Sequence, residues 1–225
     1  MKISESTYEF LTEIKDNNNK IWFDTNKKRY ISARNEFIDF LTAFMLRVNK
    51  FETLPVQDPA KCLYRIYRDV RFSPNKEPYK SHMAAIVSRG GQPKKCMFYI
   101  HLQAGETFVG GGMYDPAPEV LKAIRQEIHY NGHTLESLIS SKSFKSCFRE
   151  LYNEGKLKKA PKGYDPAHPH IELLKYKHYL VGRNCKDEVA VSEKFMDFCV
   201  ETYKASMEFY SFIDGAVLNA ESEQK

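Results

Sequence analysis

Hydrophobic residues recur every three or four positions toward both ends of the chain, and they alternate with polar residues in its middle third. The first spacing predicts helices with one apolar face, and alternation predicts strands. We therefore expect helices at both ends and a sheet between them. The expected helices are one that starts at the capping pair Ser6 and Glu9 and ends before Asn17, then 24–50, 117–130 (ended by Asn131 and Gly132), one or two short helices within 134–152, 171–176 and 192–217.

The alternating segments are short and are separated by turn-forming residues. They predict strands at about 62–71, 83–89, 96–103, 106–110 and 178–183. Because most connections between them are too short for crossovers, these strands should pair antiparallel. The fold class that follows is α+β, with a mainly antiparallel sheet of about five strands packed by N-terminal and C-terminal helices.

The length of 225 residues and a hydrophobic share of 42% allow one large domain or two small ones. The composition does not change abruptly along the chain, which favours one domain. We expect a single α+β domain over 1–218 and a flexible C-terminal tail over 219–225.

The net charge of +5 makes the chain mildly basic, which suits an anionic partner but falls short of dedicated nucleic-acid-binding proteins. Its five cysteines are widely spaced and include no CxxC pair, so we expect reduced thiols and a cytoplasmic protein. Acidic residues near the N-terminus argue against a signal peptide, and no apolar run approaches the ~20 residues of a membrane span. We expect no membrane association.

One segment combines strand-like alternation with a high density of cations. Arg and Lys occupy five of the sixteen positions from Arg65 to Lys80. In a strand, alternation would place Arg65, Asp69 and Arg71 on one face, and Arg68 among apolar residues on the other. On that second face Arg68 must reach solvent, pair with a buried carboxylate or point into a lined cavity.

Two interpretations of this segment stay open. The first face can be a ladder of exposed ion pairs, each worth roughly 0 to 1 kcal/mol. Alternatively, the segment forms a site for an anionic ligand, because guanidinium groups bind phosphate or carboxylate through two hydrogen bonds and stay charged when desolvated. The candidate ligand-binding residues are Arg65, Arg68, Arg71, Lys76, Tyr79 and Lys80.

His101 stands in the middle of an expected strand and shares a face with Tyr99 and Gln103. If His101 meets Asp69, the carboxylate would orient the imidazole as a general base. Asp69 and His101 are therefore the candidate catalytic residues. The alternative is a packed histidine that makes one structural hydrogen bond.

Other patterns in the chain carry less chemistry. Gly110–Gly112 is not followed by the GK[ST] of a phosphate-binding loop, so a bulge or tight packing against an aromatic side chain explains it better. Asp165, His168 and His170 are interrupted by prolines and lack a fourth ligand, so we expect no metal site. The basic segment 89–95 is typical of a hairpin turn. We expect no cofactor.

The segment from Arg65 to Ser73, followed by Lys76 and the run from Pro78 to Lys80, resembles the signature of the domain of unknown function 2461 family. Similar landmarks follow in the same order along nearly the whole chain: Trp22 and Phe23, Asn26 and Lys27, Tyr30, Tyr99–Leu102, Gly110–Pro116, Arg125, Pro161–Asp165, and His168 with Pro169. The resemblance implies a shared fold and a shared site. It brings no established activity.

The sequence therefore predicts an enzyme or binding domain with an Arg- and Lys-lined pocket for a phosphorylated or other anionic ligand. One alternative is a nucleic-acid-binding module, in which the cations follow a phosphate backbone and exposed tyrosines stack on bases. A second alternative is a protein-interaction domain without catalysis, in which the row of Arg and Asp only stabilises the sheet. The ligand's identity and the oligomeric state stay open.

Overall fold

The computed structural model describes residues 1–90 and 95–222. The described chain divides into two compact units. The first consists of Met1–Val87, Tyr99–Val109 and Asn184–Glu201, and the second of Ser88–Phe98, Gly110–Arg183 and the chain from Thr202 onward. The prediction of one domain over 1–218 stays a prediction. Residues 91–94 of the predicted basic turn and 223–225 of the predicted tail lie outside the described residues.

Within the described residues, four strands form one antiparallel sheet in the order β1-β2-β3-β4. The strands are β1 (Met83–Ser88), β2 (Met97–Leu102), β3 (Phe108–Met113) and β4 (Tyr179–Asn184). Helices flank the sheet, so the predicted α+β class is confirmed. Each of these strands overlaps one of the segments that alternation predicts.

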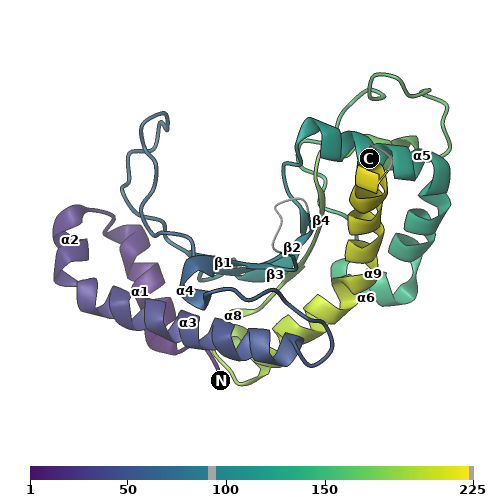
Figure 1. The fold of residues 1–225 in the computed structure, drawn as a ribbon. Helices are drawn as coiled ribbons and strands as arrows, with labels where there is room; N and C mark the ends of the chain where they lie inside the picture. The colour runs from purple at the N-terminus through teal and green to yellow at the C-terminus, as the bar shows by residue number, and fades with distance from the viewer. Residues whose placement is uncertain (91–94, 223–225) are drawn as a thin grey trace. The chain divides into compact units, whose positions relative to one another are not determined.

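The predicted strand at 62–71 is wrong, so the described sheet has four strands rather than about five. Residues 63–82 instead form a projecting loop with two antiparallel sides, which we call the arm (Figure 1). Pro78 supplies no backbone N–H to the returning side, which interrupts a regular ladder. Isolated bridges take the place of a strand: Tyr67 with Tyr79 inside the arm, and Leu63 with Ala85 of β1.

The helices of the first unit lie in the first third of the chain and around residue 190. They are α1 (Glu5–Asp16), α2 (Lys20–Thr25), α3 (Lys27–Val48), α4 (Pro59–Cys62), α8 (Asp187–Ala190) and the start of α9 (Lys194–Ser222). The predicted cap of the first helix is wrong. Ser4 rather than Ser6 caps α1, because the Ser4 hydroxyl accepts a hydrogen bond from the Thr7 N–H. The predicted helix at 24–50 corresponds to α3, which the short α2 precedes.

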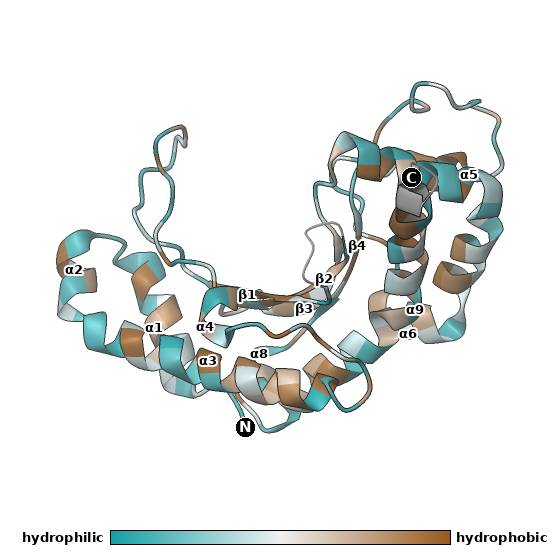
Figure 2. Ribbon diagram, viewed as in Figure 1, coloured by the Kyte–Doolittle hydropathy of each residue, from teal (hydrophilic) through white to brown (hydrophobic). Residues whose placement is uncertain are grey.

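Apolar side chains hold the helical layer of the first unit together. α1 and α3 pack against each other, and Figure 2 shows hydrophobic positions recurring along both helices. Phe37, Phe40 and Phe44 of α3 are fully buried. Phe40 stacks on Phe195 of α9 with ring centroids 5.1 Å apart. Each buried side chain of this size contributes roughly 1.5–3 kcal/mol.

The second unit contains α5 (Pro118–Ser140), α6 (Lys142–Phe148), α7 (Ile171–Leu174) and most of α9. α5 consists of two helical segments that meet at Asn131, so the predicted helix at 117–130 ends where Asn131 and Gly132 were expected to end it, and a second segment continues to Ser140. Asn131 leaves helical geometry (φ −122°, ψ 23°) and marks a kink. A Cβ on Gly132 would overlap the His170 ring, so the glycine makes room for that ring.

α9 is 29 residues long, but charged residues such as Asp197, Lys204 and Asp214 are spread along it. In the part of the chain that the structure describes, no helix is both long and apolar enough to cross a membrane.

A buried ion pair lies inside the second unit. Arg89 Nη1 is 2.6 Å from Asp214 Oδ2, and the two side chains are 10% and 11% exposed. The Cys96 N–H donates to the other carboxylate oxygen of Asp214 (2.7 Å). The Arg89 guanidinium also lies 4.8 Å from the centroid of the Tyr210 ring. Arg89 is therefore a structural cation, because removing one partner of such a pair leaves a buried charge uncompensated.

Three consecutive glycines let β3 approach its neighbours closely. A Cβ on Gly110 would overlap the carbonyl oxygen of Val181 in β4, and a Cβ on Gly111 would overlap that of Met97 in β2. The Tyr210 hydroxyl of α9 also lies against Gly111. The predicted tight packing against an aromatic side chain is thus confirmed.

We expect Gly110→Ala to lower the free energy of unfolding by more than about 2 kcal/mol, because backbone atoms of β4 cannot move aside without disturbing the sheet. Chemical denaturation measures this change. The matched control is Gly182→Ala in β4, where an added Cβ meets nothing within 4 Å. Equal effects of the two substitutions would contradict the close approach of β3 and β4.

Candidate functional site

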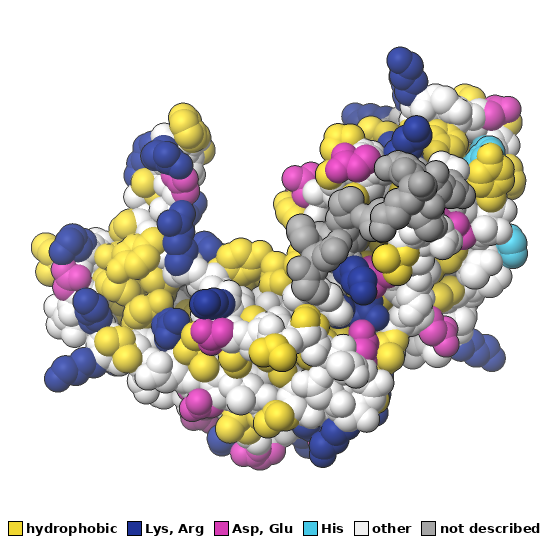
Figure 3. Space-filling view, in the orientation of Figure 1, with side chains coloured by type: hydrophobic (Ala, Val, Ile, Leu, Met, Phe, Trp, Pro, Cys, Tyr) yellow, Lys and Arg dark blue, Asp and Glu magenta, His cyan; other side chains and the backbone are white. Residues whose placement is uncertain are grey.

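The arm keeps the alternation that the sequence predicts, although it is not a strand. Ile66 is buried, whereas its neighbours Arg65 and Tyr67 are exposed. Backbone hydrogen bonds join the two sides of the arm and join it to β1: Tyr64 N to Ala84 O (2.9 Å), Arg68 N to Pro78 O (2.9 Å) and Lys80 N to Ile66 O (2.8 Å). Lys and Arg side chains gather along the arm and around its base (Figure 3).

The pairing of the two sides decides which side chains share a face. Tyr67 is paired with Tyr79, and paired residues project to the same face. Lys80 and Arg68 therefore project to the opposite face from these tyrosines, because side chains alternate along each side. We call this opposite face the cationic face of the arm; it also includes Tyr64 and His82.

Tyr79 anchors the arm to α2 and to the turn before it. Its ring stacks on Phe23 with centroids 4.1 Å apart, and only 4% of the residue is exposed. The Asn18 side chain accepts a hydrogen bond from the Tyr79 N–H (3.0 Å) and donates one to the Tyr79 carbonyl (2.9 Å). The structure thus places this predicted ligand residue as a support of the arm, with its ring withdrawn from solvent.

At the tip of the arm (69–77), the charged side chains are bonded to one another or to the backbone. Arg71 donates two hydrogen bonds to Asp69, from Nε to Oδ1 (3.0 Å) and from Nη2 to Oδ2 (2.7 Å). These bonds lower the pKa of the Asp69 carboxyl. Lys76 donates to the Val70 carbonyl (3.0 Å). Asp69 and Arg71 thus form an exposed ion pair, whereas Arg65, the third member of the predicted ladder, forms none among the described residues.

Arg68 pairs with a carboxylate, but not with the buried one that alternation allows for it. Its Nη1 lies 3.2 Å from Glu77 Oε2. The Arg68 side chain is 28% exposed and that of Glu77 is 48% exposed, so the carboxylate is not buried. A guanidinium has five N–H donors, and this contact engages one of them. Arg68 therefore keeps donors for a further acceptor.

Lys80 is half-buried next to aromatic and cationic groups. Its ammonium lies 5.1 Å from the centroid of the Tyr64 ring. Burial and the nearby Arg65 guanidinium lower the pKa of Lys80. Among the described residues, neither Lys80 nor Arg65 forms an ion pair with a carboxylate. A cation in this environment is destabilised, and a bound anion would relieve that cost.

His82 is a residue of this region that the sequence reasoning missed. It directly precedes β1, and its ring lies 4.4 Å from that of His101. Burial, followed by His101, Lys80 and Arg68, lowers the pKa of His82 to about 4. Alternation along the sequence puts His82 on the same face as Lys80. The sequence does not show how the two sides of the arm pair, so it could not show that Arg68 shares this face.

His101 already has partners on both ring nitrogens. The Tyr99 hydroxyl lies 2.9 Å from Nδ1, and Gln103 Oε1 lies 3.0 Å from Nε2. With Gln103 Oε1 as an acceptor, Nε2 carries the proton and Nδ1 accepts from Tyr99. Within the described residues Asp69 is not a hydrogen-bond partner of His101. His101 thus makes two side-chain hydrogen bonds, one more than the alternative of a packed histidine expects, and its catalytic role stays a prediction.

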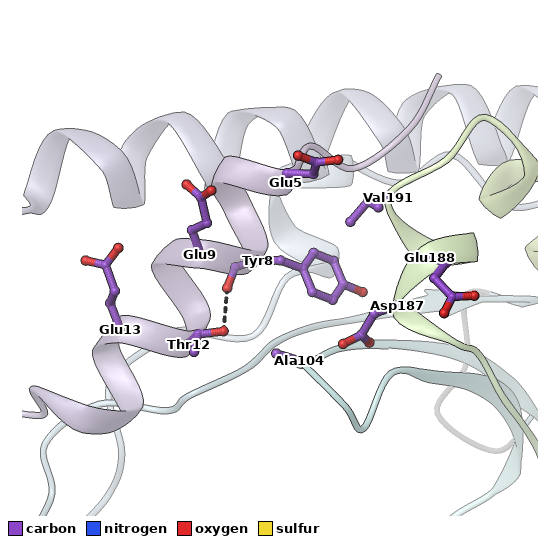
Figure 4. A pocket seen from close by; sticks show the side chains of 9 residues that line it. All are labelled: Glu5, Tyr8, Glu9, Thr12, Glu13, Ala104, Asp187, Glu188 and Val191. Atoms are coloured by element: carbon purple, nitrogen blue, oxygen red, sulfur yellow. Dashed lines mark hydrogen bonds between the residues drawn. The ribbon is translucent and has the colours of Figure 1, made fainter.

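The first unit also has an acidic hollow of about 490 Å³ beside α1 (Figure 4). Glu5, Glu9 and Glu188 line it together with Tyr8 and Asp187. The hydroxyl of Tyr8 shares a hydrogen bond with that of Thr107 (2.6 Å). Carboxylates repel an anion, so this hollow does not suit the predicted ligand. Among the described residues, no group of three or more His, Cys, Asp or Glu is arranged to hold a metal ion.

Residues 6–212 match a family model described as conserved hypothetical protein (DUF2461). The chain belongs to this family. The match includes the arm, β1 and β2, and it confirms the resemblance that the segment from Arg65 to Lys80 indicates. No curated protein and no solved structure matches the chain. Membership of the DUF2461 family supports a common fold, and the function rests on the site itself.

We expect Lys80→Ala to raise the pKa of His82 from its value of about 4, because the substitution removes a nearby positive charge. Histidine ring signals followed by NMR across a pH series measure this pKa. Lys50→Ala, which removes an exposed lysine after α3, is the matched control and should leave His82 unchanged.

In the wild type, folding stability should also fall as the pH drops from about 6.5 to about 4, because the unfolded chain then binds a proton that folded His82 does not. A wild-type His82 that titrates near 6.5 would contradict the electrostatic environment described above.

Proposed function

We propose that this protein binds a small anionic ligand, carrying phosphate or carboxylate, at the cationic face of the arm. Lys80 and Arg68 would contact the anion, and Arg65 would add positive charge nearby. The observation that carries the proposal is the half-buried Lys80, which has cationic and aromatic neighbours and no ion-pair partner among the described residues. A bound anion would supply the missing countercharge.

The chemistry of the two side chains suits phosphate and carboxylate. Arg68 can offer two parallel N–H donors to two oxygens, whereas Lys80 provides a compact charge with three donors. The contact between Arg68 and Glu77 is exposed, and such pairs are worth about 0–1 kcal/mol. A ligand oxygen can therefore replace the Glu77 carboxylate at little cost.

The contacts favour binding over proton transfer by the predicted pair of Asp69 and His101. Asp69 is held by Arg71 at the tip, and His101 has partners on both ring nitrogens. The imidazole of His82, unlike the side chains of Asp69 and His101, makes no hydrogen bond among the described residues, so it can bond to a ligand. A neutral imidazole there can donate to the ligand and accept from it.

The cysteines support a cytoplasmic location, which we also propose. All five lie in the described part of the chain and none forms a disulfide there, and Cys96, Cys185 and Cys199 are buried. Thiols stay reduced in the cytoplasm, where structural disulfides are rare. Measuring free thiols in protein isolated from its native cells under acidic quenching would test this location.

Isothermal titration calorimetry with inorganic pyrophosphate tests the proposed anion site. We expect saturable binding that weakens by about 10- to 100-fold in both Lys80→Ala and Arg68→Ala, because a hydrogen bond to a charged group contributes about 1.5–3 kcal/mol. Lys50→Ala removes the same charge from the exposed end of α3 and serves as the control.

Circular dichroism spectra of the variants check that each is folded. The proposal fails if pyrophosphate, citrate and inorganic phosphate all give no binding to the wild type. It also fails if Lys80→Ala and Arg68→Ala bind as tightly as Lys50→Ala.

A further inference from the structure

An aromatic surface lies beside the proposed anion site in the first unit. β2 and β3 contribute Tyr99, His101 and Phe108, and the arm contributes Tyr64 and His82. Successive ring centroids are 6.3 Å apart for Tyr64 and Tyr99, 5.5 Å for Tyr99 and Phe108, 4.8 Å for Phe108 and His101, and 4.4 Å for His101 and His82. Each ring contacts the next, so the rings form one continuous surface.

This surface is partly open to solvent. Tyr64 is 47% exposed, and Tyr99, Phe108 and His82 are each partly exposed, whereas His101 is 9% exposed. These rings therefore keep surface that a ligand can reach, whereas the ring of Tyr79 is withdrawn from solvent. Exposed planar groups beside a cation favour a ligand with a planar ring.

The cation and the aromatic surface are close enough to serve one small molecule. The Lys80 ammonium lies 5.1 Å from the centroid of the Tyr64 ring. An anionic group bound to Lys80 therefore lies beside Tyr64, and the rest of the ligand can extend over the rings. A ligand that uses both features must join an anionic group to a planar ring.

His82 adds polar recognition at the end of this surface. No hydrogen bond engages its imidazole within the described residues, and neither of its nitrogens is among the fully buried unpaired atoms. Both nitrogens can therefore reach a ligand. A neutral imidazole has one donor and one acceptor, which matches the edge of a nucleobase.

We propose that the ligand of this site is a mononucleotide, whose phosphate contacts Lys80 and Arg68 and whose base lies on the aromatic surface beside Tyr64. This inference rests on the anion-binding function proposed above and specifies its ligand. Aromatic side chains stack on any base. The site therefore indicates a mononucleotide but does not indicate which base it carries.

The number of available cations favours a single nucleotide over a strand. Lys80, Arg68 and nearby Arg65 carry three positive charges, enough to neutralise the charge of about −2 on one terminal phosphate. At the tip of the arm Arg71 is bound to Asp69, and Lys76 is bound to a backbone carbonyl. A strand would need cations that continue along its backbone, and the tip does not offer them unpaired.

Calorimetric titration of AMP and of ribose 5-phosphate isolates the contribution of the base, because the two ligands share the sugar and the phosphate. We expect AMP to bind more tightly by about fivefold to a hundredfold. Tyr64→Leu should reduce AMP affinity toward that of ribose 5-phosphate and leave ribose 5-phosphate unchanged. Tyr130→Leu, which removes an exposed tyrosine from α5, is the matched control and should change neither affinity.

The outcomes separate this inference from the proposed function. Equal binding of AMP and ribose 5-phosphate, with both weakened in Lys80→Ala, would overturn the mononucleotide and keep the anion site. No binding of any phosphate compound would overturn both. A single-stranded oligonucleotide that binds far more tightly than AMP, with a steep salt dependence, would overturn the mononucleotide in favour of a strand.

Discussion

β3 can run between β2 and β4 only because three consecutive residues, Gly110 to Gly112, have no side chain. At Gly110 and Gly111 the carbonyl oxygens of Val181 and Met97 occupy the positions that a Cβ would need. A shift of the strand register by one residue would move every side chain of the strand to the opposite face of the sheet. The close approach therefore sets which residues of β3 face which side. The same strand carries Phe108 into the aromatic surface next to His101.

The arm uses the alternation of a strand to build two different surfaces, although only its base pairs with β1. One face carries Tyr67 and Tyr79, which pack with Phe23 of α2 and hold the arm in place. The other face carries Lys80 and Arg68. Aromatic burial on the first face offsets the cost of holding cations on the second, where the countercharge is incomplete. Anchoring and proposed binding thus depend on opposite faces of one segment.

The charged side chains at the tip of the arm are paired, whereas the cations near β1 lack a full countercharge. The region near β1 is therefore the better candidate for binding an anion. The pairs at the tip are exposed and locally satisfied, as Asp69 and Arg71 show. Near β1 the cations are partly buried, and Lys80 and Arg68 act on the neutral imidazole of His82. A ligand that brings negative charge would stabilise these cations and would favour protonation of His82. Binding and proton uptake at this site are therefore expected to be linked.

The sequence by itself determined the α+β class, the positions of the sheet strands after residue 82, the family and the tight packing of the β3 glycines. The fold class and the strands follow from local periodicity, the tight packing follows from the glycines, and the family follows from the segment from Arg65 to Lys80. Local signals located the break at Asn131 but misplaced the cap of the first helix at Ser6, because Ser4 and Ser6 offer the same capping chemistry and only packing chooses between them.

Only the tertiary structure decided what the segment from Arg65 to Lys80 is. Alternation is the same in a sheet strand and in a projecting arm, so the sequence could not tell them apart. The pairing of Tyr67 with Tyr79 placed Arg68, Lys80 and His82 on one face, whereas Asp69 is bonded to Arg71 and His101 to Tyr99. Such pairing joins residues distant in the chain, and its free energy comes from contacts that no local pattern contains.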